Sequence, residues 1–341
     1  MKILELSPSY YQKWDDFVQN HPNSSIYHLH EWSSLIEGLF GHKPHFLFTE
    51  NNDEISGILP LIRLKSRLFG DFMTSVPYFN YGGALGKDLH TEKLLMESAG
   101  ELAESLGVSH IEFRDVKTHE NFPVKLDKIT MELKLPDSPE ELWKQFKPKL
   151  RAQIRRPEKA GAITKTGQLD LLDDFYSVFT RNMRDLGTPV YPKSFFRAIL
   201  DTFPENTQII MVYHEKTPTA AGFLIGFKDK LEIPWASSLR DYNKISVNMA
   251  LYWRVLQYAI ENRYKVFDFG RSSKDSGTYK FKKQWGAQEK QLYWHYWLKN
   301  GGELPALNPN NPKYQLAIST WKKRPLPVAN WLGPKIVKNL P

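Results

Sequence analysis

One order of predicted elements occurs twice in this chain, and this repeat limits the possible folds more than any other feature. Each copy begins with a strand, continues through two helices and turns back in a hairpin. The returning arm of each hairpin carries glycine at the same place, in EISGIL at residues 54–59 and in TAAGFL at residues 219–224. A helix and a further strand follow in both copies. Two similar series of this kind predict an α/β protein with two domains in tandem, each built on a mixed central sheet.

A short segment with two prolines, residues 136–139 (PDSP), separates the two copies. We therefore place the first domain at 1–138, the second at 139–300 and a basic, aromatic tail at 301–341. The alternating strand 128–135 is expected to close the first domain, and strand 292–297 to be the last strand of the second. The tail is expected to dock on the first domain. Contact with an anionic membrane surface is the alternative, because short segments that mix basic and aromatic residues bind such surfaces.

Composition narrows the class of protein. Of the 341 residues, 41% are hydrophobic and 25% charged, which is typical of a globular protein, and the length suits two cores. The absence of cysteine excludes disulfides, thiol nucleophiles and thiolate metal sites. Neither a leader peptide nor an apolar run of about 20 residues is visible, so we expect a cytoplasmic protein. The net charge of +8 favours anionic partners such as nucleic acid, nucleotide sugars or lipid surfaces.

The segment 265–287 has the composition of an anion-binding site. Val266 to Phe269 alternate as a strand that stops at Gly270, and a serine- and glycine-rich loop follows. Aromatic and basic residues then alternate closely over 279–283 (YKFKK). Lysine heads supply positive charge, loop amides supply donors, and aromatic rings exclude water. The alternative is a hairpin with a solvated basic edge.

A second basic region lies on the predicted helix that starts near Glu140. Arg151, Arg155 and Lys159 form a stripe beside an apolar stripe of Phe146, Leu150 and Ile154. Arg151 and Arg155 are candidates for binding phosphates of a nucleotide sugar or of a tRNA backbone, although a solvated helix face is the alternative. Pro157 is expected to kink or end this helix.

Several segments resemble the FemAB-like family, and most closely its branch associated with exosortase (PEP-CTERM) and exopolysaccharide systems. The resemblance spans nearly the whole chain and is carried by FGHKPHF (40–46), PYFNYGG (77–83), LRAQIRRPEKAGA (150–162), FDFGRS (267–272), GTYKFKKQWG (277–286), NPNNPKY (308–314) and RPLPVANWLGPKI (324–336). Proteins of this family are acyl or aminoacyl transferases built from two tandem domains of the N-acetyltransferase (GNAT) fold. The resemblance therefore implies two tandem GNAT-like domains and a transferase of the cell envelope.

The resemblance also implies which residues act. It makes Phe281 and Lys282 the catalytic pair, with Lys282 neutralising charge on the acyl carbonyl or acceptor phosphate and Phe281 shaping the acyl pocket. Arg271 is the next candidate, as an anion clamp. Asp268 is expected to orient Arg271 or Lys282, and a structural salt bridge is the alternative. The remaining substrate-binding candidates are Tyr279, Lys280, Trp235 (stacking on the acceptor), Tyr242, Asn80 and Tyr81.

The acyl donor is constrained by a missing motif. An acyl-CoA enzyme cradles pyrophosphate on a glycine-rich helix start, whereas residues 240–247 (RDYNKISV), before the second copy's last helix, contain no glycine. Acyl-CoA is therefore not supported, no cofactor is expected, and aminoacyl-tRNA is the donor that the resemblance implies. His28, His30 and His45 lack metal-ligand spacing with acids and are interpreted as structural, so no metal is expected.

Two departures from the family concern the acceptor. The chain has no long inserted helix pair, and residues 33–37 after Trp32 lack a lysine found in enzymes acting on UDP-linked muramyl peptide. The sequence thus predicts an acyl or aminoacyl transferase acting on an anionic precursor of peptidoglycan or exopolysaccharide. The alternatives are a CoA-dependent N-acyltransferase on a nucleotide sugar and a non-catalytic module that binds carbohydrate or tRNA.

Overall fold

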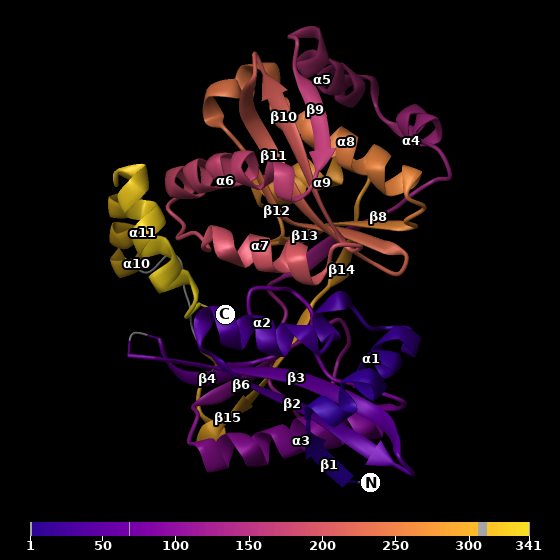
Figure 1. Ribbon diagram of the computed structural model, residues 1–341, viewed down its shortest axis with the longest axis vertical. Helices are drawn as coiled ribbons and strands as arrows, with labels where there is room; N and C mark the ends of the chain where they lie inside the picture. Colours follow the sequence, from indigo (N-terminus) through magenta and orange to yellow (C-terminus); the bar gives the residue numbers. More distant parts are fainter. Residues whose placement is uncertain (1, 68, 306–311, 341) are drawn as a thin grey trace. The chain divides into compact units, whose positions relative to one another are not determined.

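The computed structural model describes residues 2–67, 69–305 and 312–340, and the chain divides into two compact units (Figure 1). One unit consists of Met1–Ile129, Gln291–Leu307 and Lys338–Pro341, and the other of Thr130–Lys290 and Asn308–Val337. Each unit is built on a mixed sheet with helices packed against it. The predicted fold class, two tandem α/β units, is confirmed.

The first unit contains a sheet in the order β1-β2-β3-β4-β6-β15-β7, with β5 paired to β3. Its pairs are antiparallel except for β4 and β6, which are parallel. Its strands are β1 (Lys2–Glu5), β2 (Lys43–Asn51), β3 (Glu54–Ser66), β4 (Gly70–Thr74), β5 (Leu85–Gly86), β6 (His110–Asp115), β7 (Val124–Lys125) and β15 (Tyr293–Leu298), and its helices are α1 (Tyr11–Asn20), α2 (Glu31–Phe40) and α3 (Leu89–Leu106).

The second unit has the sheet order β14-β8-β13-β12-β11-β10-β9, in which β12 and β13 pair in parallel. Its strands are β8 (Ile129–Lys134), β9 (Ile163–Gly167), β10 (Thr207–His214), β11 (Thr217–Phe227), β12 (Lys230–Ser238), β13 (Val266–Ser272) and β14 (Gln288–Gln291), and its helices are α4 (Pro139–Gln145), α5 (Pro148–Lys159), α6 (Leu172–Leu186), α7 (Lys193–Thr202), α8 (Val247–Glu261), α9 (Gly277–Lys283), α10 (Pro312–Lys322) and α11 (Leu326–Val337).

The repeat predicted from the hairpin glycines is present. Gly57 lies in β3 and Gly222 in β11, the returning arms of the two hairpins. A Cβ at Gly57 would lie 2.6 Å from the Thr91 side chain of α3, and one at Gly222 would lie 3.4 Å from the Leu251 side chain of α8. Gly57 therefore allows α3 to pack closely on the hairpin, whereas the closest contact at Gly222 is the Ile233 side chain of the neighbouring strand β12, at 2.9 Å.

Two strands belong to the opposite unit from the one expected. The strand expected to close the first domain, β8, instead lies between β13 and β14 in the second sheet. The strand expected to end the second domain, β15, pairs with β6 in the first sheet, with Tyr293 opposite Asp115 and Leu298 opposite His110. In each unit, the strand that pairs with β6 or β13 therefore comes from a distant part of the sequence. The chain passes between the units near residues 129 and 291, not at the predicted boundaries 138 and 300.

The predicted basic helix is two helices. α4 ends at Gln145, and Lys147 has an extended backbone (φ −62°, ψ 149°) before α5 begins at Pro148. Proline disfavours a helical conformation in the residue before it, which explains the break. Phe146 is buried at this break, while Leu150 and Ile154 form the buried stripe of α5 as predicted. Pro157 lies inside α5, which ends two residues later.

The tail packs mainly on the second unit, not on the first as expected. Helices α10 and α11 contact α6, and Arg184 Nη1 of α6 donates to the Arg324 carbonyl oxygen at 3.0 Å. The start of the tail, up to Leu307, and its last residues belong to the first unit, where Tyr78 Oη donates to the Lys338 carbonyl oxygen at 2.8 Å. Residues 308–311 of the NPNNPKY segment lie outside the described residues. Within the ranges described, none of the helices has both the length and the apolar character required to cross a membrane.

Candidate functional site

The candidate site lies in the second unit, where parallel strands β12 and β13 part. Their pairing covers only Lys230–Glu232 with Val266–Asp268, although β12 continues to Ser238 and β13 to Ser272. Gly270, just beyond the last pair, has a left-handed backbone (φ 77°) that favours glycine. Main-chain groups at such a divergence are available to a ligand rather than to the neighbouring strand.

Lys282 is directed at this end of β13. The segment after the loop is the helix α9, not the edge of a hairpin, and Ser276 caps it by accepting a hydrogen bond from the Tyr279 amide at 3.2 Å. Lys282 is only 6% exposed, and its Nζ donates to the carbonyl oxygens of Gly270 (2.8 Å) and Arg271 (2.9 Å). Burial lowers the pKa of Lys282 to about 8, and the nearby carboxylates of Asp268 and Glu232 limit that decrease.

Asp268 is fully buried and holds strands together. Its Oδ1 accepts from Thr130 Oγ1 of β8 at 2.6 Å and from the Gly270 amide at 2.8 Å. These bonds fix the backbone at Gly270, which in turn binds Lys282. Asp268 is thus linked to Lys282 by its negative charge and through Gly270, whose amide it binds and whose carbonyl oxygen accepts from Lys282.

Glu232 was missed by the sequence analysis. It is 6% exposed on β12 and lies directly opposite Asp268 in the β12–β13 register. Its signal in the sequence was an isolated acid within an otherwise apolar strand, LEIPW. Two buried carboxylates beside one buried ammonium group form a charged cluster inside the sheet, which is expensive to bury and is often a sign of function.

A pocket of about 340 Å³ lies beside α9, at the start of α8. Its polar walls carry amides and a hydroxyl rather than charges, and Phe281 and Met249 supply apolar surface. The lining residues are Gln153, Asn243, Ser246, Asn248, Met249, Phe281 and Gln284. Ser246 has a left-handed backbone (φ 63°) and its side chain does not cap α8. The start of α8 thus lines the pocket without a side-chain cap, although the Met249 amide donates to the Ser246 carbonyl oxygen at 2.8 Å.

The predicted catalytic pair occupies two sides of one helix. Phe281 lines the pocket and packs edge-on against Tyr252 at 4.9 Å, whereas Lys282 turns toward β13. Arg271 is exposed at the end of β13. Lys280 is exposed on α9, and Tyr279 donates to Glu289 Oε1 at 2.5 Å. The structure thus brings this group together around α9.

Trp235 is part of the core. It is 8% exposed, and its ring meets Phe195, Phe196 and Phe223 edge-on at 5.1 to 5.7 Å. This aromatic cluster between the sheet and α7 explains the residue, and it leaves no open ring face for stacking on an acceptor.

Three further candidates surround the pocket without lining it. Arg151 is half-buried on α5, and the guanidinium of Arg155 lies 5.1 Å from the Trp143 ring centre. Tyr242 is half-buried in the 3₁₀ helix Arg240–Ile245, with its ring 5.8 Å from that of His214. Their neighbours Gln153 and Asn243 are the residues that face the cavity.

Asn80 and Tyr81 belong to the first unit. Tyr81 is 8% exposed and stacks at 6.5 Å on Tyr27, and Asn80 is half-buried beside it. The Arg114 guanidinium donates to the Phe79 carbonyl oxygen at 2.5 Å and anchors the same segment. These contacts account for the PYFNYGG segment as a packed loop.

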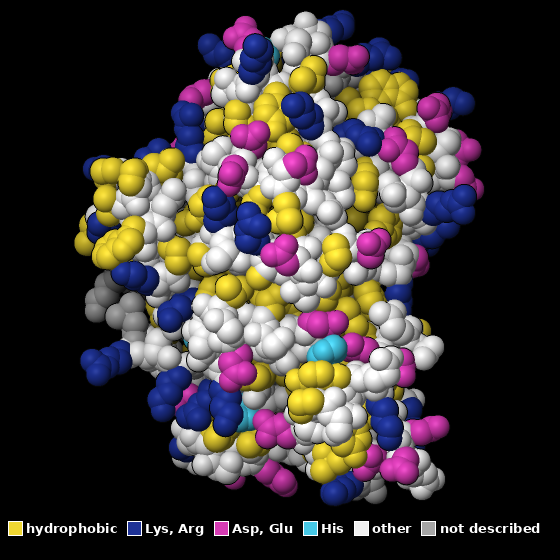
Figure 2. All heavy atoms as spheres, in the orientation of Figure 1, with side chains coloured by type: hydrophobic (Ala, Val, Ile, Leu, Met, Phe, Trp, Pro, Cys, Tyr) yellow, Lys and Arg dark blue, Asp and Glu magenta, His cyan; other side chains and the backbone are white. Residues whose placement is uncertain are grey.

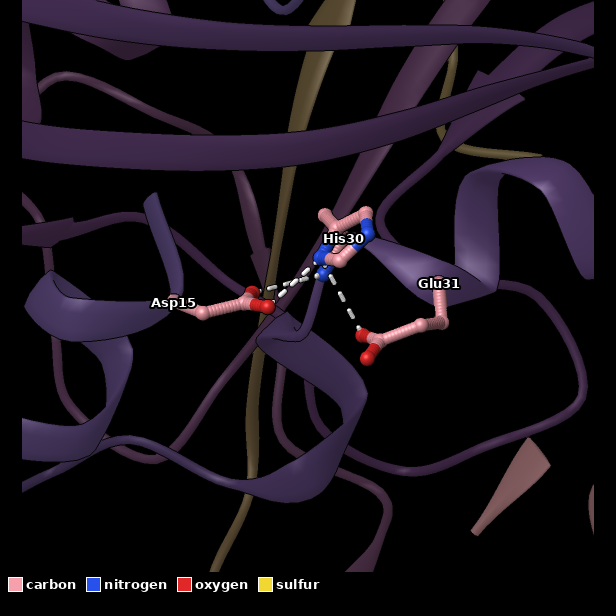
Figure 3. Close-up of side chains that lie close together, drawn as sticks. All are labelled: Asp15, His30 and Glu31. Atoms are coloured by element: carbon pink, nitrogen blue, oxygen red, sulfur yellow. Dashed lines mark hydrogen bonds and ion pairs between the residues drawn. The ribbon is translucent and has the colours of Figure 1, made fainter. Parts of the chain in front are cut away.

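One histidine of the first unit lies among acids, contrary to expectation (Figure 3). His30 Nδ1 lies 2.6 Å from Asp15 Oδ2 and 3.3 Å from Glu31 Oε2. Partial burial lowers the pKa of His30, but the hydrogen bond and charge of Asp15 outweigh it and raise the pKa overall. The three groups could hold a cation, yet one ring nitrogen already serves both carboxylates, which is the arrangement of an ion pair.

The other two histidines contact groups within the first unit. His28 is buried; its Nδ1 accepts from the Ser25 amide at 3.1 Å, so its Nε2 donates to the Gly83 carbonyl oxygen at 3.1 Å. Burial lowers the pKa of His28 to about 4. His45 Nδ1 lies 2.9 Å from Glu5 Oε1.

Comparisons with known proteins agree with this architecture. The family described as "Acetyltransferase (GNAT) domain" matches residues 144–283, which lie in the second unit and include β12, β13 and α9. No curated protein sequence matches the chain.

Several solved structures share the fold. The structure of FemX has a TM-score of 0.66 at 17% identity and covers 93% of this chain and 100% of FemX. A C-terminal domain assigned to a lysylphosphatidylglycerol synthetase of Agrobacterium fabrum has a TM-score of 0.57 at 13% identity, over 86% and 92% of the two chains. A tandem GNAT protein from the clavulanic acid biosynthesis pathway has a TM-score of 0.54 at 10% identity, over 89% and 99%. The fold is therefore two tandem GNAT-like domains.

Proposed function

We propose that this protein is an acyl or aminoacyl transferase of Fem type that acts in cell-envelope biosynthesis, on an anionic precursor of peptidoglycan or exopolysaccharide. The observation that carries the proposal is the buried Lys282, held by main-chain carbonyls where β12 and β13 part, on a helix whose other side presents Phe281 to a polar pocket. The tandem fold shared with FemX and with the synthetase domain supports it. We place the protein in the cytoplasm.

The chemistry requires no covalent enzyme intermediate. The amine or hydroxyl of the acceptor attacks the acyl carbonyl, the new C–N or C–O bond forms, and the C–O bond to the donor breaks as the leaving oxygen takes up the proton. Negative charge develops on the carbonyl oxygen during the attack. Lys282 would stabilise this charge in a low-dielectric setting, where one ammonium group has a large effect. Its burial keeps the group fixed and water away.

The donor is proposed to bind in the pocket at the start of α8. The pocket lining is uncharged, so it suits the acyl group and the adjoining uncharged part of a donor. Arg271 and the basic residues of α5, Arg151 and Arg155, are proposed to bind donor or acceptor phosphates. Aminoacyl-tRNA meets these requirements, and no cofactor is proposed.

The test replaces Lys282 with methionine and measures transfer from aminoacyl-tRNA to a UDP-linked muramyl peptide or a lipid-linked saccharide. Loss of one charge-stabilising group is expected to reduce kcat at least about a hundredfold, with little change in donor affinity. Lys280→Met, which removes an exposed lysine from the same helix, is the matched control. Equal activity of both variants would contradict the assignment of Lys282, and loss of binding without any wild-type turnover would favour a non-catalytic tRNA- or carbohydrate-binding module.

A CoA-dependent N-acyltransferase acting on a nucleotide sugar is the second candidate. It is favoured by the match of residues 144–283 to the acetyltransferase domain and by the position of the pocket at a helix start. Thermal shift distinguishes the donors. Stabilisation by acetyl-CoA and not by aminoacyl-tRNA would replace the first proposal with the second.

A further inference from the structure

The tail helices α10 and α11 carry positive charge without an acidic residue. Residues 312–340 contain six basic residues and neither aspartate nor glutamate: Lys313, Lys322, Lys323, Arg324, Lys335 and Lys338. In the chain as a whole 46 basic residues are balanced by 38 acidic ones. The tail is thus much more basic than the protein around it.

One side of the tail is fixed to the second unit. Ala329, Gly333 and Val337 recur at helical spacing and form the buried side of α11. The backbone of Gly333 lies so close to Val190 that a Cβ there would be 2.8 Å from the Val190 nitrogen, and Ile318 of α10 lies similarly close to Gly187. The tail therefore has a defined orientation on this unit and a defined outer face.

The outer face combines apolar and basic side chains. Val328, Trp331 and Lys335 recur at i, i+3 and i+7 on the side of α11 away from the buried stripe, and Trp331 is 66% exposed. The Lys335 ammonium lies 3.6 Å from the Trp331 ring centre. On α10, Leu316 is 69% exposed. Figure 2 shows yellow apolar groups mixed with dark blue basic ones over these helices.

We infer that this face docks on an anionic membrane surface. Tryptophan prefers the boundary between headgroups and acyl chains, exposed leucine and valine gain from entering it, and lysines reach anionic headgroups with their stems along apolar surface. A nucleic-acid backbone would pair with the charges but would leave Leu316 and Val328 in water, so the mixture favours lipid. The inference is independent of the proposed transferase activity.

The test is co-sedimentation of the full chain with lipid vesicles. Vesicles of phosphatidylcholine with about one-third phosphatidylglycerol are expected to bind the protein, and pure phosphatidylcholine vesicles are not. Binding to the anionic vesicles is expected to fall several-fold as salt rises from about 0.05 M to about 0.5 M. Absence of binding to anionic vesicles, or equal binding to neutral ones, would overturn the proposal.

Variants locate the contact. The substitution Lys335→Glu on the outer face is expected to weaken binding at least about fivefold, since each cation near the surface contributes roughly that factor. Trp331→Ala is expected to weaken it several-fold. Ile163→Ser is the matched control, because Ile163 is 57% exposed on strand β9, which lies away from α10 and α11 (Figure 1). If the tail variants bind as tightly as the control, the proposal fails; unchanged melting temperatures show that the variants are folded.

Discussion

At the scale of single residues, the energetics of Lys282 are unusual. Its ammonium group is buried and lacks a carboxylate hydrogen-bond partner among the described residues, relying on two main-chain carbonyls. Burial disfavours the charged form of this group, and the carbonyls and the nearby carboxylates of Asp268 and Glu232 offset that cost only in part. A buried lysine that is costly to keep charged is the pattern of a residue kept for function.

The pKa of Lys282 predicts how stability varies with pH. The pKa of Lys282 is about 8 in the folded protein, whereas the ordinary value of 10.5 applies in the unfolded chain. Between pH 8 and pH 10.5 the unfolded chain therefore binds more protons than the folded protein. Stability is then expected to rise with pH across that window, by at most about 3 kcal/mol. Denaturant unfolding at pH 8 and pH 10 measures this rise, which Lys282→Met should abolish and Lys280→Met should retain. A rise that persists in Lys282→Met would show that other groups cause it.

At the scale of elements, the sequence predicts which segments form strands and helices better than it predicts their partners. The hairpins, their glycines and the helix that follows in each copy are present in the predicted order. Strands β8 and β15 were also recognised, but each pairs in the other unit. An alternating pattern defines the two faces of a strand, and it does not encode which distant edge the strand joins.

Which residues of the candidate site lie together could be predicted only where they are close in sequence. Asp268, Arg271 and Lys282 are neighbours in sequence or across one short loop, so their proximity followed from local order. The pocket residues Gln153, Asn243 and Gln284 come from three separate elements, and their convergence depends on packing that no single segment reveals. Trp235 shows the opposite error, because an aromatic residue in a strand is far more often core than ligand platform.

The docking of α11 on the second unit gives a prediction at the element scale. Gly333→Val would place a branched side chain against the Val190 backbone, where even a Cβ has only 2.8 Å. We expect α11 to detach while the sheet of the unit remains folded, because the contact lies outside the sheet. Limited proteolysis should then cleave the tail faster than in the wild type. Gly301→Val is the control, because Gly301 has open space around it. The left-handed backbone of Gly301 (φ 66°) adds local strain to this variant without a contact to α11. Equal cleavage of the Gly333 variant and the wild type would contradict this account.

At the scale of the whole molecule, the larger part of the second unit, Thr130–Lys290, is an insertion in the first, and the rest of that unit follows later in the chain as Asn308–Val337. The chain leaves the first unit near Ile129 and returns at Gln291, and these points are adjacent: the Gln291 side chain donates to the Lys128 carbonyl oxygen at 2.8 Å. Insertions with neighbouring ends are well tolerated because they leave the host sheet intact. The first unit is consequently discontinuous in sequence, and β6 depends on β15 for its outer neighbour.

This dependence predicts how truncation affects folding. A chain that ends at residue 138 keeps β6 but lacks β15, so the row of N–H and C=O groups that pairs with Tyr293–Leu298 is exposed. We expect this truncated chain to aggregate rather than to unfold cooperatively as a monomer, as judged by gel filtration and circular dichroism. Joining residues 1–129 to residues 291–305 through a short glycine–serine linker should restore a monomer. A monomeric, cooperatively unfolding 1–138 chain would show that β15 is dispensable.

The position of β15 in the sequence also determines when the first sheet can be completed during synthesis on the ribosome. From the end of β6 at Asp115 to the start of β15 at Tyr293 the chain has 178 residues (293 − 115) still to be made. At roughly 5–20 residues per second, this takes on the order of 10–35 s. Throughout that interval the nascent first sheet has an open edge, while the inserted unit is made and can begin to fold. The first part of the protein to be translated is thus among the last to be completed, and its exposure to chaperones is set by the length of the insertion.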